Sequence, residues 1–462
     1  MALLALLIVC QGATAATTPA DSPTTEDAEI ASLRQELAAV KRDYDSRIAE
    51  LEARLASIED TSSLEETAAA GTTAVPAVTP TPSVAVAAAP VVPSRGNAAF
   101  NPAIGVIFQG QAWDYSGHGE ENAIPGYPAG GEAGPIPKGL ALGETEIDAN
   151  ANVDNLFTAW LTTALVPEDG EIAVEIEEAW VETLGLPLGF STRFGRFYSD
   201  VGYLNGKHSH TWDFADQPLA YKAFLGNQYG DDGIQVRWLA PTDLYLELGG
   251  EVFRGDHYPA AGAANGGLGS NTLFAKLGGD AGVSSSWLTG ISYLHARSDA
   301  RPSGPEDEPL LFDGTTDMVI AEFVWKWAPN GNWRRKNLVL QSELLWRNEN
   351  GRYLLPDGSS PDIDRDQWGW YAQVVYQPIT QWRVGARFDL LSNDDPGPAF
   401  AGTALDPLGS DPKRYTVMAD WSPSEFSRLR LQYAWDDSGI DSFSQWGLQY
   451  IQSIGAHGAH TF

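Results

Sequence analysis

Cysteine is almost absent from this chain, which has one, Cys10, among 462 residues. A single cysteine forbids a disulfide within the chain, and it excludes the zinc sites, haem attachment and thiol catalysis that depend on cysteine. Apolar runs of 18 or more residues are also absent, so the chain is not a helical membrane protein. Basic residues are scarce, with 29 lysines and arginines against 61 acids. The net charge of −32 excludes nucleic acid as an expected partner.

Enzyme signatures are lacking too. The sequence contains no GxSxG, no HExxH and no phosphate-binding loop. His118, His257 and His295 have no neighbouring motif that would build an active site at the rim of a barrel. We therefore predict that the protein is not an enzyme.

Three segments precede the region that carries the main pattern. Residues 1–15 predict a signal peptide, because the apolar core is followed by the A-x-A site Ala13-Thr14-Ala15. Residues 27–60 predict a coiled-coil oligomerisation stalk, because apolar residues recur in steps of three and four between charged ones. A single amphipathic helix docked on another domain is the alternative. Residues 61–98, rich in Ala, Thr and Pro, predict a linker.

Residues 99–462 show the period of β-strands. Segments of about ten residues alternate in polarity or are rich in aromatics, and their number is even. We predict sixteen strands at 104–115, 141–151, 157–166, 171–183, 190–199, 233–241, 243–254, 270–280, 285–297, 316–327, 336–348, 368–378, 381–392, 413–422, 427–437 and 443–454.

The connections between these segments alternate in length. Short turns follow the even-numbered strands, and most connections after odd-numbered strands are long: 116–140, 200–232, 255–269, 298–315, 349–367 and 393–412. Short turns on one rim and long loops on the other are typical of an outer-membrane barrel. The predicted fold class is therefore all-β, an antiparallel transmembrane β-barrel of 16 strands at 99–462, with both barrel ends on the periplasmic side.

Three stretches carry a resemblance to a known family. They are NPAIGVIFQG (101–110), the long and specific segment 202–248, and IGAHGAHTF (454–462). Residues 99–462 resemble proteobacterial outer-membrane proteins that are labelled zinc-regulated or TonB-dependent outer-membrane receptors, or porin-like proteins. The receptor label departs from this sequence, because a TonB-dependent transporter has a plug domain and a 22-stranded barrel.

Acidic side chains alternate with apolar ones along three predicted strands. Charge on the lipid face is expensive, so the acids are predicted to face the lumen. Residues 99–462 hold 48 acids and 23 bases, and the sequence is predicted to lack the basic ladder that a phosphate-selective pore would need. The predicted pore-lining residues are Glu144, Glu146, Asp148, Glu171, Glu175, Glu177, Glu247 and Glu251.

The third long loop, 200–232, carries the candidate metal site. The architecture resembles sixteen-stranded general porins, and this resemblance implies that the loop folds into the lumen. His208 and His210 share one side of an extended segment near Asp213 and Asp216, and these four residues are the predicted metal ligands. Ordinary pKa values near 6.5 would leave both imidazoles neutral and able to ligate at neutral pH. Two hydrogen-bonding histidines without a metal are the alternative.

Two further groups are weaker metal candidates. His457 and His460 form a pair near the end of the chain. The triplet Asp362, Asp364 and Asp366 lacks the glycine of an EF-hand and is predicted to lie in a solvated outer loop, where divalent ions could bridge it to lipopolysaccharide. The interpretation requires no cofactor, and zinc or calcium is the divalent cation it would admit.

The predicted function is passive uptake of small hydrophilic solutes or cations through an outer-membrane, porin-like channel with an acidic lumen. A metal receptor of the TonB-dependent type and an envelope-tethering structural barrel are the alternatives. The expected partners are outer-membrane lipid, lipopolysaccharide, two further copies of the chain in a homotrimer, and peptidoglycan reached by the stalk. The predicted location is the cell outer membrane, with the stalk in the periplasm.

Overall fold

The computed structural model describes residues 102–117, 123–127, 136–168, 171–262, 267–304, 309–392 and 394–455, without the side chains of 167, 168 and 171. The predicted signal peptide (1–15), stalk (27–60) and linker (61–98) lie outside the described residues and stay predictions. The barrel is described by itself.

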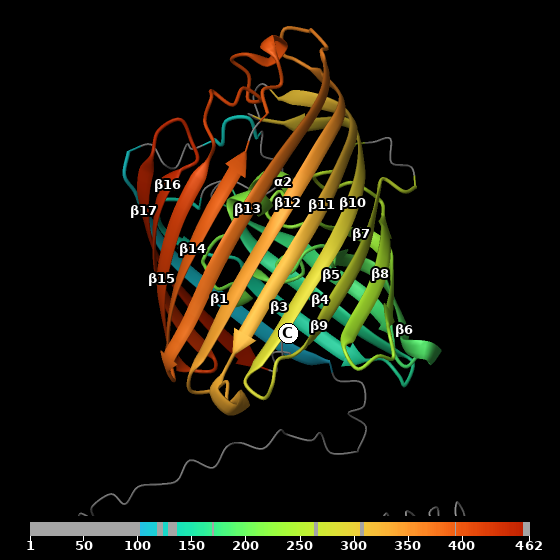
Figure 1. Cartoon of the computed structure of the whole chain (residues 1–462), viewed down its shortest axis with the longest axis vertical. Helices are drawn as coiled ribbons and strands as arrows, with labels where there is room; N and C mark the ends of the chain where they lie inside the picture. Colours follow the sequence, from blue (N-terminus) through green and yellow to red (C-terminus); the bar gives the residue numbers. More distant parts are fainter. Residues whose placement is uncertain are drawn as a thin grey trace, which may run out of the picture. The chain divides into compact units, whose positions relative to one another are not determined.

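Strands make up most of the described part of the chain (Figure 1). The strands are β1 (Ala103–Tyr115), β2 (Gly139–Leu142), β3 (Thr145–Asn152), β4 (Phe157–Glu168), β5 (Glu171–Thr183), β6 (Phe190–Tyr198), β7 (Gly230–Leu239), β8 (Tyr245–Phe253), β9 (Ser270–Asp280), β10 (Ser285–Ser303), β11 (Leu310–Trp327), β12 (Asn337–Leu354), β13 (Asp362–Ile379), β14 (Trp382–Ser392), β15 (Lys413–Ser424), β16 (Ser427–Asp437) and β17 (Phe443–Gly455).

The strands close into one antiparallel barrel. Each strand from β3 to β16 pairs with the next, and β17 pairs with β1 from Gly105↔Gly455 to Tyr115↔Gln445. β2 and β3 both pair with β1, so they form one interrupted strand of the barrel. Counting this pair as one, the barrel has sixteen strand positions, or staves, as the sequence predicts.

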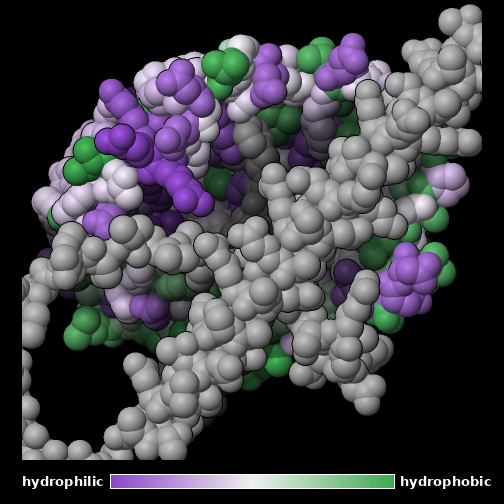
Figure 2. Space-filling view, turned by 90° about the horizontal axis from the view of Figure 1, so that it is seen from below, coloured by the Kyte–Doolittle hydropathy of each residue, from purple (hydrophilic) through white to green (hydrophobic). Residues whose placement is uncertain are grey.

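Polarity along the strands is inverted relative to a soluble protein. On β17, Gln445 and Gln449 are buried inside, whereas Trp446, Leu448 and Tyr450 are exposed on the outer face. Viewed from the short-turn end, hydrophobic residues are visible around the outer wall and hydrophilic residues gather at the rim (Figure 2). A closed barrel satisfies every backbone hydrogen bond between strands, so an apolar exterior of this kind can lie in lipid.

Aromatic rings mark the outer surface. Trp370, Phe388, Tyr415 and Trp435 contact one another in a row across β13 to β16. Trp382 and Trp421 pair near the opposite ends of β14 and β15. Rows of rings at two levels are typical of the girdles that lie at the lipid–water interfaces. In the described residues no helix is long and apolar enough to cross a membrane.

The strand bounds confirm most of the sequence prediction, with one correction. The predicted loops 298–315 and 349–367 are largely strand, because β10 to β13 extend past the rim and leave only 304–309 and 355–361 between them. Asp362, Asp364 and Asp366 consequently lie on β13 and not in an outer loop. These extensions are rich in charged residues, glycine and proline, which are typical of loops, although one face buries Phe312, Tyr353 and Ile363.

The connection between β6 and β7, residues 199–229, folds inward and forms the largest buried cluster. We call this segment the third loop. It contains the helix η3 (Ser209–Thr211) and the helix α2 (Leu219–Leu225), whose residues are all buried. α2 packs against β12, β13 and β14 (Figure 1). Loop residues such as Phe224 cluster with inward-facing wall residues such as Leu345.

The lipid-facing assignment predicts the effect of a charge in the middle of the outer wall. Val417 lies on β15 between the aromatic levels of Tyr415 and Trp421 and is 51% exposed. Val417→Arg should lower the free energy of unfolding in lipid by about 2–4 kcal/mol, because it places a cation near the bilayer midplane. Ile440→Arg, in the loop before β17, should change it by less than about 0.5 kcal/mol. Equal effects, measured by urea unfolding in vesicles, would contradict the membrane assignment.

Candidate functional site

On one side of the lumen the third loop contacts four acids of β3, β5 and the segment before β3. We call these acids, Glu144, Glu146, Glu177 and Glu178, the acidic wall. Oγ of Ser209 donates a hydrogen bond of 2.9 Å to Oε1 of Glu144 on the segment leading into β3. Nε2 of His208 lies 2.9 Å from Oε2 of Glu178 on β5, and Nδ1 of His210 lies 2.8 Å from Oε1 of Glu146 on β3. Both predicted histidines therefore contact wall carboxylates that lie more than 28 residues away in the sequence.

A β-bulge shapes this wall. In the pairing of β4 with β5, Thr162 lies opposite Glu178 and Thr163 opposite Ile176, so Glu177 is the additional residue. A bulge breaks the alternation of side chains, and here it turns two consecutive carboxylates inward. Nδ1 of His208 lies 3.4 Å from Oε2 of Glu177 and 3.5 Å from Oε2 of Glu146.

The surroundings of His208 change its protonation. Burial alone lowers the pKa of the imidazole, but the nearby carboxylates of Glu146, Glu177 and Glu178 outweigh burial and raise the pKa well above its ordinary value. The ordinary pKa predicted from the sequence is therefore wrong for His208.

On the other side of the lumen the third loop meets strands that carry buried arginines. We call the side that carries these arginines, Arg301, Arg347, Arg365, Arg387, Arg414 and Arg430, the arginine wall. Nη2 of Arg387 lies 3.0 Å from Oδ1 of Asp216, and Nη1 of Arg414 lies 2.7 Å from its Oδ2. Burial raises the pKa of Asp216, but the two guanidinium groups outweigh burial and hold the pKa well below its ordinary value. Asp213 pairs with Arg383 at 2.8 Å. These ion pairs fix the second half of the loop to β14 and β15.

The predicted ligand set His208, His210, Asp213 and Asp216 is not assembled. Both aspartates face arginines, because the chain turns away from the acidic wall after Thr211. Among the described residues, the group whose ligand atoms come within 4.8 Å of one another is Glu146, Glu177 and His208. Of the four predicted ligands, His208 alone belongs to this group.

Two further carboxylates hold the beginning of the third loop. Oε1 of Glu251 on β8 accepts hydrogen bonds from the backbone of Asp200 at 2.9 Å and from Gln235 at 2.7 Å. Oε1 of Glu343 on β12 accepts from the backbone of Tyr203 at 2.5 Å and from the hydroxyl of Tyr221 at 3.0 Å. The loop is thus hydrogen-bonded to β8, β12, β3, β5, β14 and β15.

The predicted pore-lining acids differ in their surroundings. Glu146, Asp148 and Glu251 are buried inside the barrel, and Asp148 accepts a 2.9 Å hydrogen bond from Thr162. Glu144, Glu175 and Glu177 line a cavity of about 600 Å³ beside the third loop. Glu247 lies opposite Lys276 in the pairing of β8 with β9. The side chain of Glu171 lies outside the described set.

The inferred lack of a basic ladder is wrong. The arginine wall carries a series of nearly fully buried arginines, which the sequence scatters over 130 residues. Glu349 accepts from Arg301 at 2.6 Å and from Arg365 at 3.2 Å, so acids on the same wall offset part of this charge. The inward-facing members of the series are Arg301, Arg347, Arg365, Arg387, Arg414 and Arg430.

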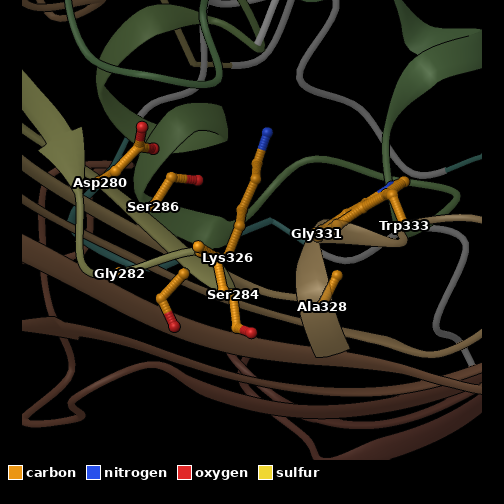
Figure 3. Close-up of a pocket in the computed structure, with 10 residues that line it drawn as sticks. Asp280, Gly282, Ser284, Ser286, Lys326, Ala328, Gly331 and Trp333 are labelled. Atoms are coloured by element: carbon orange, nitrogen blue, oxygen red, sulfur yellow. The ribbon is translucent and has the colours of Figure 1, made fainter.

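A separate pocket of about 450 Å³ opens at the short-turn rim (Figure 3). It lies between the turn at 281–284 and the turn at 328–336, and the side chain of Lys326 extends beside it. Lys326 and Trp333 also line a cavity of about 230 Å³ that reaches Tyr203 and Asp213 of the third loop. The rim pocket therefore adjoins the space beneath the third loop.

The two weaker metal candidates have less structural support. His457 and His460 lie outside the described residues. On β13, Asp364 and Asp366 each accept a hydrogen bond from Asn348 of β12, at 3.1 and 3.0 Å. These contacts lie on the exposed outer face, and a divalent bridge from them to lipopolysaccharide stays a prediction.

Comparison with known proteins gives one relative in sequence. An uncharacterized protein of Aquifex aeolicus is 33% identical over 342 residues, which are 70% of this chain and 70% of that protein. The chain belongs to the same family as this Aquifex protein. No family model matches the chain.

Solved structures of outer-membrane proteins are similar to this chain at low sequence identity. The outer membrane channel DcaP of Acinetobacter baumannii has a TM-score of 0.47 and 14% identity, over 76% of this chain and 97% of that chain. The loop L8 deletion mutant of OmpT of Vibrio cholerae has 0.45 and 11%, over 77% and 100%. An anion-selective porin from Comamonas acidovorans has 0.43 and 10%, over 76% and 99%.

The ion pairs of Asp216 predict how firmly the third loop is held. Asp216→Ala should lower the free energy of local opening of residues 207–225 by about 1.5–3 kcal/mol, because it removes the charged hydrogen bonds from the loop to Arg387 and Arg414, which keep Asp389 as a partner. Hydrogen exchange measured by mass spectrometry should show faster exchange in that segment and unchanged exchange in β15 and β16. Asp357→Ala, in an exposed turn, is the control and should leave the loop unchanged. Equal protection of the loop in both variants would contradict this anchoring.

Proposed function

We propose that the protein is a porin-like outer-membrane channel that passes small hydrophilic solutes by diffusion. The observation that carries this proposal is a charged loop folded inside a closed barrel with an apolar exterior. A loop of this kind narrows the lumen, and charged side chains at a constriction select solutes by charge and size.

The arrangement of cavities supports a path through the barrel. The cavity of about 600 Å³ beside Glu175 and the cavity of about 230 Å³ beside Arg383 share Trp212 as a lining residue. The second of these adjoins the pocket at the short-turn rim through Lys326. Together they extend from the rim to both sides of the third loop.

The alternative functions receive less support. A TonB-dependent receptor has a larger barrel of 22 strands filled by a plug, whereas this barrel has sixteen staves. A purely structural tether needs no charged walls in the lumen, yet β3 and β5 carry buried acids, and β12 to β16 carry buried arginines interleaved with acids. Both features favour transport of polar solutes.

The predicted assembly belongs to this proposal as well. Apolar residues at 30–58 need partners, so the predicted stalk favours self-association, and a homotrimer remains the proposed state. In the same proposal the outer surface contacts lipid and lipopolysaccharide, and the stalk extends toward peptidoglycan.

Cation preference follows from the surplus of acids. With 48 acids and 23 bases in residues 99–462, reversal potentials in a salt gradient should show that cations permeate better than anions. Replacing Glu144 and Glu175 together by Gln should reduce this preference, and the reduction should be larger at 0.01 M than at 1 M salt, since salt screens the charge of the wall.

The matched control removes two acids outside the lumen. Asp357→Asn with Asp406→Asn changes the net charge by the same amount at exposed turns and should leave the reversal potential unchanged. Anion preference in the wild type, or an equal shift in both double variants, would contradict the assignment of these acids to the pore.

A further inference from the structure

Three side-chain atoms converge where the third loop meets the acidic wall. They are Oε2 of Glu146, Oε2 of Glu177 and Nδ1 of His208. The histidine nitrogen lies 3.5 Å from the Glu146 oxygen and 3.4 Å from the Glu177 oxygen. All three atoms are buried and have no hydrogen-bond partner among the described residues. A buried polar atom without a partner is unfavourable by about 1–3 kcal/mol, so three at one point indicate a missing ligand.

The separations fit a tetrahedral metal ion. Zinc binds histidine nitrogen at about 2.0–2.1 Å and carboxylate oxygen at about 2.0–2.2 Å, which places neighbouring ligand atoms about 3.3–3.5 Å apart. The two distances from Nδ1 of His208 have these values. Three protein ligands leave the fourth position of the tetrahedron for water or a solute.

Each of the three side chains is oriented through its other polar atom. Nε2 of His208 is bonded to Glu178, Oε1 of Glu146 to His210 at 2.8 Å, and Oε1 of Glu177 to the hydroxyl of Tyr198 at 3.1 Å. Metal sites use such outer contacts to fix the tautomer of the histidine and the direction of the carboxylates. The contacts leave the unpartnered atoms directed at one another.

We propose that Glu146, Glu177 and His208 bind one divalent ion of the zinc type. Imidazole with carboxylate oxygen suits zinc, whereas calcium prefers six to eight oxygen ligands. A divalent ion also offsets the negative charge of Glu146, Glu177 and Glu178, whose ion pairs among the described residues are with histidine. Because His208 belongs to the third loop and both glutamates to the wall, the ion joins the loop to β3 and β5.

Isothermal titration calorimetry of the folded, chelator-treated full chain tests the site without depending on conduction. The wild type should bind one zinc ion per chain, and calcium should not compete. Glu177→Gln keeps the size of the side chain and should weaken zinc binding more than about 100-fold, as should His208→Ala, since the loss of a ligand exceeds a second-shell effect. Tyr198→Phe should weaken it about 10-fold.

Three controls separate this site from other zinc ligands. His257→Ala removes a histidine that contacts a single carboxylate, Asp231, and should leave the affinity unchanged. Glu175→Gln and the double variant H457A/H460A should also retain it. Heat-modifiable mobility on gels establishes that each variant is folded. Absence of stoichiometric zinc binding in the wild type would overturn the proposal, and so would unchanged affinity in folded Glu177→Gln.

Discussion

The apolar exterior of the barrel is the constraint on which the other features depend. Charge is expensive where lipid contacts the wall, so the charged side chains of the strands collect inside the barrel. Buried charges require partners, and both the wall strands and the third loop provide them. From the loop, Asp213 and Asp216 reach the arginine wall, and His208 and His210 reach the acidic wall.

These contacts connect charge balance with the shape of the pore. Removing one partner of a buried pair costs about 3–5 kcal/mol, so each contact helps to keep the loop inside. The loop lies between the acidic wall and a wall of paired arginines and acids, so a solute passing it meets charged groups on both sides. An ion held by Glu146, Glu177 and His208 would add a stronger link on the acidic side.

The sequence predicts the staves well because lipid imposes a strict alternation on each strand. It fails for the ends of β10 to β13, where charged residues such as those at 362–366 resemble a loop although one face buries Phe312 and Tyr353. The site was predicted only in part. His208 stands out as a histidine pair with His210, but its partners Glu146 and Glu177 depend on the path of the loop. The doublet Glu177-Glu178, which interrupts the alternation of β5, was the one sequence signal of the bulge.

The central claim is that the third loop narrows an open barrel. Single-channel recording in planar bilayers tests it most directly, by comparing the wild type with a variant whose residues 203–226 are replaced by a short Gly-Ser link that joins β6 to β7. We expect discrete conductance steps in the wild type and larger steps in the variant, because the segment that narrows the lumen is gone. Steps of equal size in the two proteins, or a wild type that conducts no ions, would contradict it.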